Sequence, residues 1–150
     1  MHPHAAPFRT IAAMIQAART VLASQPFSAL LGTEVSSFER GAIDLRLPIT
    51  ERVTQQYGFV HGGVVSYMAD NALTFTGGSV LGPQVVTSEY KISYLRPAQG
   101  KALIARARLV HGGRNLAVSE CRVFAVDAEG AERLCAIALG SVMRLPEVTQ

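Results

Sequence analysis

Residues 62–78 of the chain read GGVVSYMADNALTFTGG, and this stretch decides the fold. It contains no proline, and its apolar residues recur at the spacing of an α-helix. We therefore predict a helix over residues 62–76 that ends at the glycine pair Gly77–Gly78, a common helix stop. Strand-like runs flank the helix at residues 33–49, with a turn at residues 39–41, and at residues 85–95, 102–110, 116–126 and 133–145.

The strand-like runs after the helix are joined by short turns rich in glycine, proline and aspartate. Because a parallel pair of strands needs a crossover of about a dozen residues or more, neighbouring runs must pair antiparallel. A lone helix must bury its apolar side against the resulting sheet, and a long twisted sheet can curl around it. The sequence thus predicts an α+β domain with about six antiparallel strands wrapped around one central helix.

The N-terminal residues predict a further helix outside this domain. Apolar residues recur at helical spacing over residues 11–22, and two polar side chains interrupt the hydrophobic run that a secretion signal needs. We expect an amphipathic surface helix followed by a short connector over residues 27–31. The predicted boundaries are an N-terminal helical extension over residues 1–31 and the main domain over residues 32–150.

The composition limits the classes of function. The chain has 150 residues, 49% of them hydrophobic, and a formal net charge of +3, as one globular domain commonly has. The basic residues are scattered and tryptophan is absent, so a nucleic-acid partner is not expected. Because no run of about 18 or more apolar residues occurs, no membrane association is expected either. Two cysteines in no metal-ligand pattern favour reduced thiols, a cytoplasmic location and the absence of a metal or cofactor.

A projection of the central helix at about 100° per residue separates two faces. The face that we assign to the protein's own sheet carries Val64, Val65, Met68, Ala72 and Phe75. The other face carries Gly63, Ser66, Tyr67, Asp70, Thr74 and Gly77. This second face is too polar for a core and too poor in charge for open solvent, so we expect it to be buried against another subunit. Asp70 is its only ionisable carboxylate.

Burial of Asp70 at a subunit contact needs a reason. The loss of hydration is costly in free energy for an ionised carboxylate unless hydrogen bonds replace the lost water. One hypothesis is a general base or nucleophile. The alternative is a structural carboxylate that bonds a backbone group or an arginine across the contact. Gly62 and Gly63 favour the first hypothesis, because they leave the first-turn N–H groups of the helix open to a developing negative charge. A glycine pair can also mark only a tight turn into the helix.

Two further motifs extend this pattern. Residues 55–63 read QQYGFVHGG and precede Asp70 and Asn71, and residues 87–98 read TSEYKISYLRPA. Together with the turn at 113–114, these motifs resemble hotdog-fold acyl-CoA thioesterases of the phenylacetate-degradation (PaaI-like) type over roughly residues 32–145. The resemblance implies the hotdog fold: a long central helix wrapped by a curved antiparallel sheet of about six strands, here with an extra N-terminal helix.

The resemblance also implies roles for individual residues. In similar enzymes the acid at the position of Asp70 activates water or attacks the thioester, and the backbone N–H of Gly63 or Gly62 polarises the carbonyl. His61 would orient the thioester and Gln55 would hold the attacking water, both from the neighbouring subunit. Many relatives carry asparagine at the position of Gln55. The resemblance does not fix whether the longer side chain of Gln55 reaches the same water.

Further positions are expected to contact the nucleophile or the substrate. Thr87 matches a hydroxyl near the nucleophile, with an ordinary β-branched strand residue as the alternative. Asn71 and Gly113 are expected to line the substrate site. Arg96 and Arg114 can contact the phosphates or the adenine end of coenzyme A, which would suit the mild positive charge.

The expected partners are an acyl-CoA substrate and a second copy of the chain, in a homodimer with shared sites that pairs into a tetramer. The nearest rival on the same fold is a hydratase or dehydratase of acyl thioesters, which needs a histidine paired with an acid. His61 and Asp70 lie nine residues apart on one helix and cannot meet within one subunit. A non-hydrolytic acyl-CoA binder is the third hypothesis, although it leaves the retained Asp70 unexplained. Aromatic and medium-chain aliphatic acyl groups both stay open.

Overall fold

The computed structural model describes residues 10–147, so the part of the predicted N-terminal extension before residue 10 lies outside the described residues. Its elements follow the order α1 (Ile11–Ala23), α2 (Pro26–Leu31), β1 (Glu34–Glu39), β2 (Ala42–Pro48), η1 (Glu51–Val53), α3 (Gly62–Leu81), β3 (Val85–Tyr94), β4 (Ala102–Gly112), β5 (Leu116–Val126) and β6 (Glu132–Arg144). All the predicted strand runs are confirmed, with ends that differ by two residues at most.

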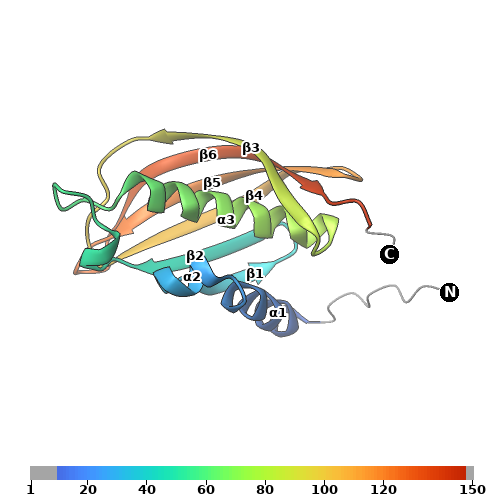
Figure 1. Ribbon diagram of the computed structural model, residues 1–150, viewed down its shortest axis with the longest axis horizontal. Coiled ribbons are helices and arrows are strands. Elements are labelled where there is room, and N and C mark those ends of the chain that lie inside the picture. The colour runs from blue at the N-terminus through green and yellow to red at the C-terminus, as the bar shows by residue number, and fades with distance from the viewer. Residues whose placement is uncertain (1–9, 148–150) are drawn as a thin grey trace.

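The strands form one antiparallel sheet in the order β1-β2-β4-β5-β6-β3. β3 follows α3 along the chain but pairs with β6, so β1 and β3 are the two edges. The sheet curves around α3, which contacts every strand from β2 to β6 (Figure 1). The predicted hotdog arrangement of one central helix and six strands is therefore confirmed.

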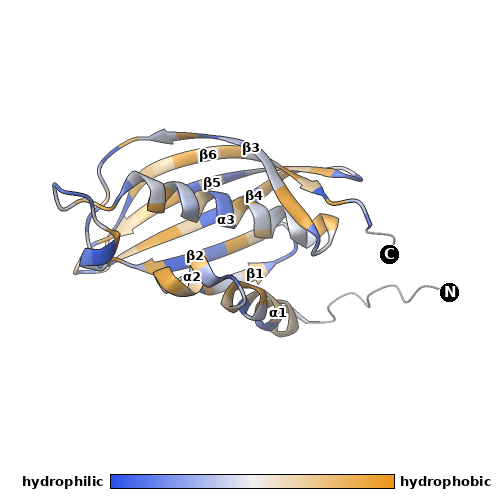
Figure 2. Cartoon of the chain, viewed as in Figure 1, coloured by the Kyte–Doolittle hydropathy of each residue, from blue (hydrophilic) through white to orange (hydrophobic). Residues whose placement is uncertain are grey.

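The hydrophobic core lies between α3 and the concave face of the sheet. Along β2, the alternate residues Ile43, Leu45 and Leu47 are fully buried, as are Met68 and Leu73 on the helix. Each such side chain contributes about 1.5–3 kcal/mol through burial. Figure 2 shows hydrophobic residues along the strands and a hydrophilic stretch in the middle of α3. That stretch breaks the apolar character of the helix where it carries the candidate acid.

The N-terminal segment folds into two helices, of which α1 packs against β1 and α2 contacts Tyr67 of α3. α1 begins after Thr10, whose side chain caps the first turn, and it buries Ala18 and Leu22, which confirms the predicted surface helix. The connector predicted after it is wrong, because that segment forms α2. Pro26 at the start of α2 has its backbone preset for a helix, and Gly32 ends the helix with a φ of 75°.

α3 is longer than predicted. It continues through Gly77 and Gly78 to Leu81 and ends at Gly82, which has a φ of 105°. The assignment of Gly77 to the polar face is also wrong, because the residue is buried against β6. An ideal Cβ on Gly77 would lie 2.8 Å from the Cβ of Val142. The glycine therefore permits a close approach of helix and sheet, and this packing overrides its tendency to stop a helix.

A β-bulge interrupts β3 at Ser88. Thr87 pairs with Val142 and Tyr90 pairs with Gly140, so the partner strand advances by two residues while β3 advances by three. Side chains normally alternate along a strand, and residues three apart would then point to opposite faces. Because of the extra residue, Thr87 and Tyr90 both face α3.

Candidate active site

The loop that leads into α3 is held by a tight turn. The N–H of Gly58 donates to the carbonyl of Gln55 (3.0 Å), and the N–H of Gln55 donates to the carbonyl of Phe59 (2.8 Å). Gly58 has a φ of 86°, a conformation that other residues rarely adopt. Beyond the turn, the N–H of Val60 donates to the carbonyl of Ala98 (2.9 Å). The motif before the helix is thereby tied to the connection between β3 and β4.

The first turn of α3 presents one open amide. His61 caps the helix, and its Nδ1 accepts the N–H of Gly63 at 2.8 Å. The N–H of Gly62 has no hydrogen-bond acceptor within residues 10–147. It shares a peptide unit with the carbonyl of His61, which accepts the N–H groups of Val64 (2.9 Å) and Val65 (3.3 Å). Those two bonds polarise the peptide and strengthen Gly62 as a donor.

A cavity of about 380 Å³ lies beside this open amide. Its lining residues are Gln55, Phe59, Val60, Gly62, Val65, Tyr94, Leu95, Arg96, Pro97 and Ala98. Two of the predicted site residues, Gln55 and Arg96, thus lie at the same cavity as Gly62. The Oε1 atom of Gln55 accepts the backbone N–H of Tyr57, which leaves the NH₂ group of Gln55 to donate elsewhere. The cavity can therefore present an amide side chain and a backbone N–H to a polar ligand.

Asp70 lies in the middle of α3 and is half-buried. Its Oδ1 accepts a hydrogen bond from the hydroxyl of Thr87 at 2.5 Å, so the predicted hydroxyl does reach the acid. The hydroxyl of Thr74 lies 2.9 Å from both the Thr87 hydroxyl and the Asp70 carbonyl. The hydroxyls of Thr74 and Thr87 have one proton each. Because Thr87 donates its proton to Asp70, Thr74 donates either to the Thr87 hydroxyl or to the backbone carbonyl of Asp70. No arginine within the described residues forms an ion pair with Asp70.

The acid and the open amide are separated along the helix. Asp70 follows Gly62 by eight residues, which corresponds to about 12 Å along the helix axis. The cavity at Gly62 does not include Asp70 among its lining residues. One chain thus carries two separate halves of a candidate site.

Two further hydroxyl groups of β3 contact α3 between its start and Asp70. The hydroxyl of Tyr94 donates to the carbonyl of Gly62 (2.9 Å), and the hydroxyl of Tyr90 lies 2.6 Å from that of Ser66. Sequence reasoning predicted a hydroxyl contact on this strand only for Thr87. Two further tyrosines on a strand beside a polar helix face were a signal, but strict alternation would have divided the three residues between both faces of the sheet.

The remaining predicted substrate contacts are more scattered. The Nδ2 of Asn71 lies 3.1 Å from the Tyr67 hydroxyl and 3.4 Å from the Ser28 hydroxyl, so the amide faces α2. Gly113 and Arg114 lie in the exposed turn between β4 and β5, and the preceding Gly112 lies beside Val80 in the last turn of α3. Arg96 lies at the opposite end of that helix. One chain therefore does not bring Arg96 and Arg114 together.

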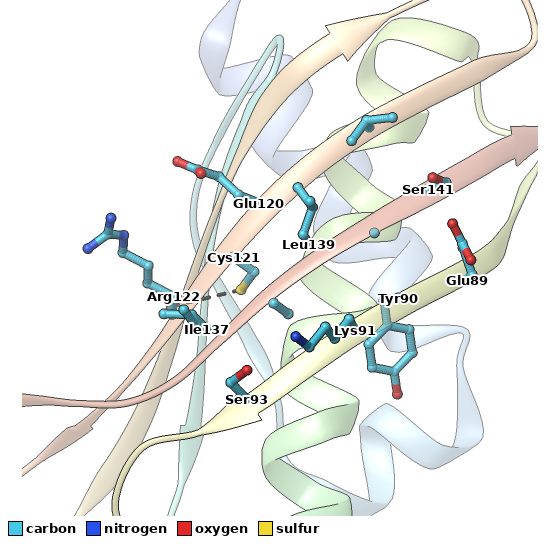
Figure 3. A pocket seen from close by; sticks show the side chains of 13 residues that line it. Glu89, Tyr90, Lys91, Ser93, Glu120, Cys121, Arg122, Ile137, Leu139 and Ser141 are labelled. Atoms are coloured by element: carbon cyan, nitrogen blue, oxygen red, sulfur yellow. Dashed lines mark hydrogen bonds between the residues drawn. The ribbon is translucent and has the colours of Figure 1, made fainter.

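A second hollow, of about 500 Å³, lies on the face of the sheet that points away from α3 (Figure 3). Glu89, Lys91, Glu120 and Arg122 line it together with exposed apolar residues of β6. None of the predicted catalytic residues lines this hollow. Its mixed charges and its distance from the open amide make it a poor site for the predicted chemistry.

The other polar clusters of the described residues are structural. Arg106 binds Glu132 through two hydrogen bonds of 2.6 and 2.8 Å, and these bonds hold the pKa of Glu132 below its usual value. Burial raises the pKa of Cys121 to about 12, so this thiol is no nucleophile at neutral pH. Burial also raises the pKa of Cys135. Residues 10–147 hold no group of three or more potential metal ligands and no helix able to cross a membrane.

Comparison with known proteins identifies the family. Residues 57–132, which include Asp70 and the pair Gly62–Gly63, match the family model of the Thioesterase superfamily. The chain belongs to this superfamily. A thioesterase family protein from Silicibacter pomeroyi has a similar solved structure, with 33% identity and a TM-score of 0.81 over 87% of this chain and 96% of that one.

Two further relatives of this chain confirm its PaaI-like resemblance. A mutant of the phenylacetic acid degradation protein PaaI from Thermus thermophilus is 28% identical, with a TM-score of 0.70 over 81% of this chain and 100% of that one. The proofreading thioesterase EntH of Klebsiella pneumoniae is 26% identical over 75% of this chain and 82% of its own length. The predicted enzyme class, a thioester hydrolase, is therefore confirmed.

Proposed function

We propose that this thioesterase hydrolyses acyl-CoA to the free acid and coenzyme A at a site shared by two copies of the chain. Asp70 acts as general base or nucleophile, and the N–H of Gly62 is the main donor to the carbonyl oxygen. One observation carries the proposal. Asp70 and the open amide lie about 12 Å apart on one helix, whereas a base and an oxyanion donor must both reach one carbonyl, directly or through one water.

The edge strand β3 supports the way in which two copies would meet. It pairs with β6 on one side only, and Val86 and Tyr94 on it are exposed. Antiparallel pairing of β3 with its copy across a twofold axis satisfies the free backbone groups. The two α3 helices would then lie side by side in opposite directions, and Asp70 of one copy would face Gly62 of the other. Pairs of such dimers form the proposed tetramer.

The same arrangement brings together the separated basic residues. Because the helices run in opposite directions, Arg96 near the start of one α3 approaches Arg114 near the end of the other. Two guanidinium groups at the mouth of one site suit the phosphates of coenzyme A. This placement supports the role proposed for both arginines.

The chemistry follows from these groups. The free NH₂ of Gln55 donates to the oxygen of the attacking water, and Asp70 of the other copy accepts one of its protons. A C–O bond forms, and the oxyanion accepts the N–H of Gly62 until the C–S bond breaks. The proton then neutralises the departing thiolate. Direct attack by Asp70 would instead form an anhydride, which water opens to the same products.

Release of coenzyme A from a panel of acyl-CoAs, graded in chain length and including aromatic acyl groups, tests the function. We expect turnover of at least one member and a decrease of about 100-fold or more for Asp70→Asn. Glu89→Gln is the matched control, since it removes a carboxylate from the outer face of β3 beside the site. Normal hydrolysis by Asp70→Asn contradicts the role of Asp70. Binding without release from any acyl-CoA favours a non-hydrolytic binder.

Complementation tests the shared site. Asp70→Asn and Gln55→Ala each inactivate both sites of their own homodimer, but a mixed dimer has one site with both wild-type halves. We expect mixing after subunit exchange to restore activity toward half that of the wild type in each mixed dimer. Absence of recovery, with exchange verified by mass spectrometry, argues against a shared site.

A further inference from the structure

Tyr94, the last residue of β3, contacts the helix start at the open amide. Its hydroxyl donates to the carbonyl of Gly62 at 2.9 Å, and its ring lies about 3.6 Å from the position of a Cβ on Gly62. Tyr94 also lines the cavity of about 380 Å³.

The acceptor of this hydrogen bond belongs to a peptide unit that also holds His61. The carbonyl of Gly62 and the N–H of Gly63 share one amide plane, and that N–H donates to Nδ1 of His61 at 2.8 Å. A hydrogen bond at the carbonyl oxygen of an amide makes its N–H a stronger donor. The Tyr94 hydroxyl is thereby coupled to the imidazole through a single peptide.

This coupling fixes the proton of the imidazole. Because Nδ1 of His61 accepts the N–H of Gly63, the neutral ring carries its proton on Nε2. An imidazole held in this tautomer offers an N–H to a carbonyl oxygen. The other tautomer would offer a lone pair, which repels a developing oxyanion. The orientation of the Gly62–Gly63 peptide therefore decides whether His61 presents an N–H or a lone pair to the substrate.

We propose that Tyr94 is a positioning residue for thioester hydrolysis. It holds the Gly62–Gly63 peptide, and through it keeps His61 as an Nε2–H donor to the thioester. The inference rests on the proposed function, since it assigns His61 and Gly62 to the carbonyl of the substrate. Tyr94 itself touches neither the acid nor the reacting atoms.

Tyr94→Phe removes the hydroxyl and keeps the ring, and Tyr90→Phe is the matched control. Tyr90 lies on the same strand and contacts the same helix, but its hydroxyl bonds Ser66. One oxyanion donor is worth about 100- to 1000-fold in rate, and cooperativity changes such a bond by about 10–30%. We therefore expect Tyr94→Phe to lower kcat by about 2- to 8-fold with an unchanged KM, and Tyr90→Phe to leave kcat unchanged.

The coupling to His61 gives a sharper test. In a His61→Ala background, Tyr94→Phe should cause no further decrease in kcat, because the group that it positions is gone. Equal decreases in both backgrounds overturn the proposal. So does a wild-type kcat for Tyr94→Phe, an effect on KM alone, or an equal effect of Tyr90→Phe.

Nitrogen NMR of the His61 ring tests the coupling without turnover. The wild type should show an unprotonated Nδ1 and a protonated Nε2, assigned by comparison with His61→Gln. Tyr94→Phe should shift these resonances toward a mixture of tautomers, whereas Tyr90→Phe should not. Identical spectra overturn the proposal even if hydrolysis is observed. If the wild type releases no coenzyme A, the proposed function fails, and the spectra still decide whether Tyr94 controls the ring.

Discussion

Substitution of Gly63 by alanine should break the hydrogen bond between the backbone N–H of residue 63 and the His61 imidazole. An ideal Cβ on Gly63 would lie 2.9 Å from Nδ1 and 3.2 Å from Cε1 of His61. The residue has an ordinary helical backbone, so alanine fits the main chain. The imidazole is the flexible partner and must rotate away. Gly63→Ala thus keeps the N–H of residue 63 but displaces His61 from the start of α3.

The effect on stability should be small. Loss of the cap costs about 1 kcal/mol, and alanine in place of glycine in a helix contributes up to about 1 kcal/mol in the opposite sense. We expect the free energy of unfolding in urea to change by less than about 1 kcal/mol. Activity should fall much further, by about 100-fold in kcat, which is the loss typical of one preorganised donor.

A double-mutant cycle tests the reasoning. If Gly63→Ala acts only by displacing the ring, it should cause no further loss in a His61→Ala background, and the double variant should match His61→Ala. Wild-type activity of Gly63→Ala would show that the ring position is unimportant. A double variant that is about 10,000-fold impaired would show two independent effects and refute the mechanism.

Three further perturbations follow from the contacts. Thr87→Val should lower kcat/KM by about 10- to 100-fold, because a hydrogen bond to a charged group is worth about 1.5–3 kcal/mol and this hydroxyl orients Asp70; Thr87→Ser should retain most activity, and equal losses would contradict orientation by the hydroxyl. Gly140→Ala would place a Cβ 2.7 Å from the Cβ of Tyr90, so we expect a loss of about 1–3 kcal/mol and a Tm lower by several degrees, whereas an unchanged Tm would contradict this packing. Burial raises the pKa of Cys121 from 9.0 to about 12, so between these values the native state binds more protons than the unfolded chain. The stabilisation is complete below about pH 9 and falls by about 1.4 kcal/mol per pH unit above it; urea titrations should show a shallower decline for Cys121→Ala, and the same slope in both proteins would contradict the assignment.

The sequence was sufficient to predict most of the fold, because the relevant signals are local. The span predicted for β5, Leu116–Val126, is correct at both ends, since turn residues bound an uninterrupted strand pattern. The length of the turns then required antiparallel pairing. The polar face of α3 was also readable from helical periodicity, and Asp70 and Thr74 on it do lie at one contact with β3.

The features that could not be predicted depend on tertiary contacts. Gly77 reads as a helix stop, but its missing side chain is needed against Val142, a residue 65 positions away. Pro26 and Gly32 bound a segment of six residues, too short for helical periodicity to appear. The contact of Tyr94 with Gly62 depends on the register of β3 after its bulge. The acid, the open amide and the Thr87 hydroxyl were found by pattern, whereas the contact of the Tyr94 hydroxyl with Gly62 required coordinates.

The bulge at Ser88 gives this exposed residue an importance that its chemistry does not suggest. Its side chain makes no hydrogen bond within the described residues, so replacement of Ser88 by another residue except proline should be tolerated. Deletion of Ser88 would leave a regular ladder in which Thr87 still pairs with Val142 and Tyr90 with Gly140, so each side chain would keep its face. If Ser88 were kept but paired regularly, strict alternation would turn Glu89 and Lys91 toward the helix and both tyrosines toward solvent. Thr87 and the two tyrosines therefore share one face only because Ser88 stays outside the ladder.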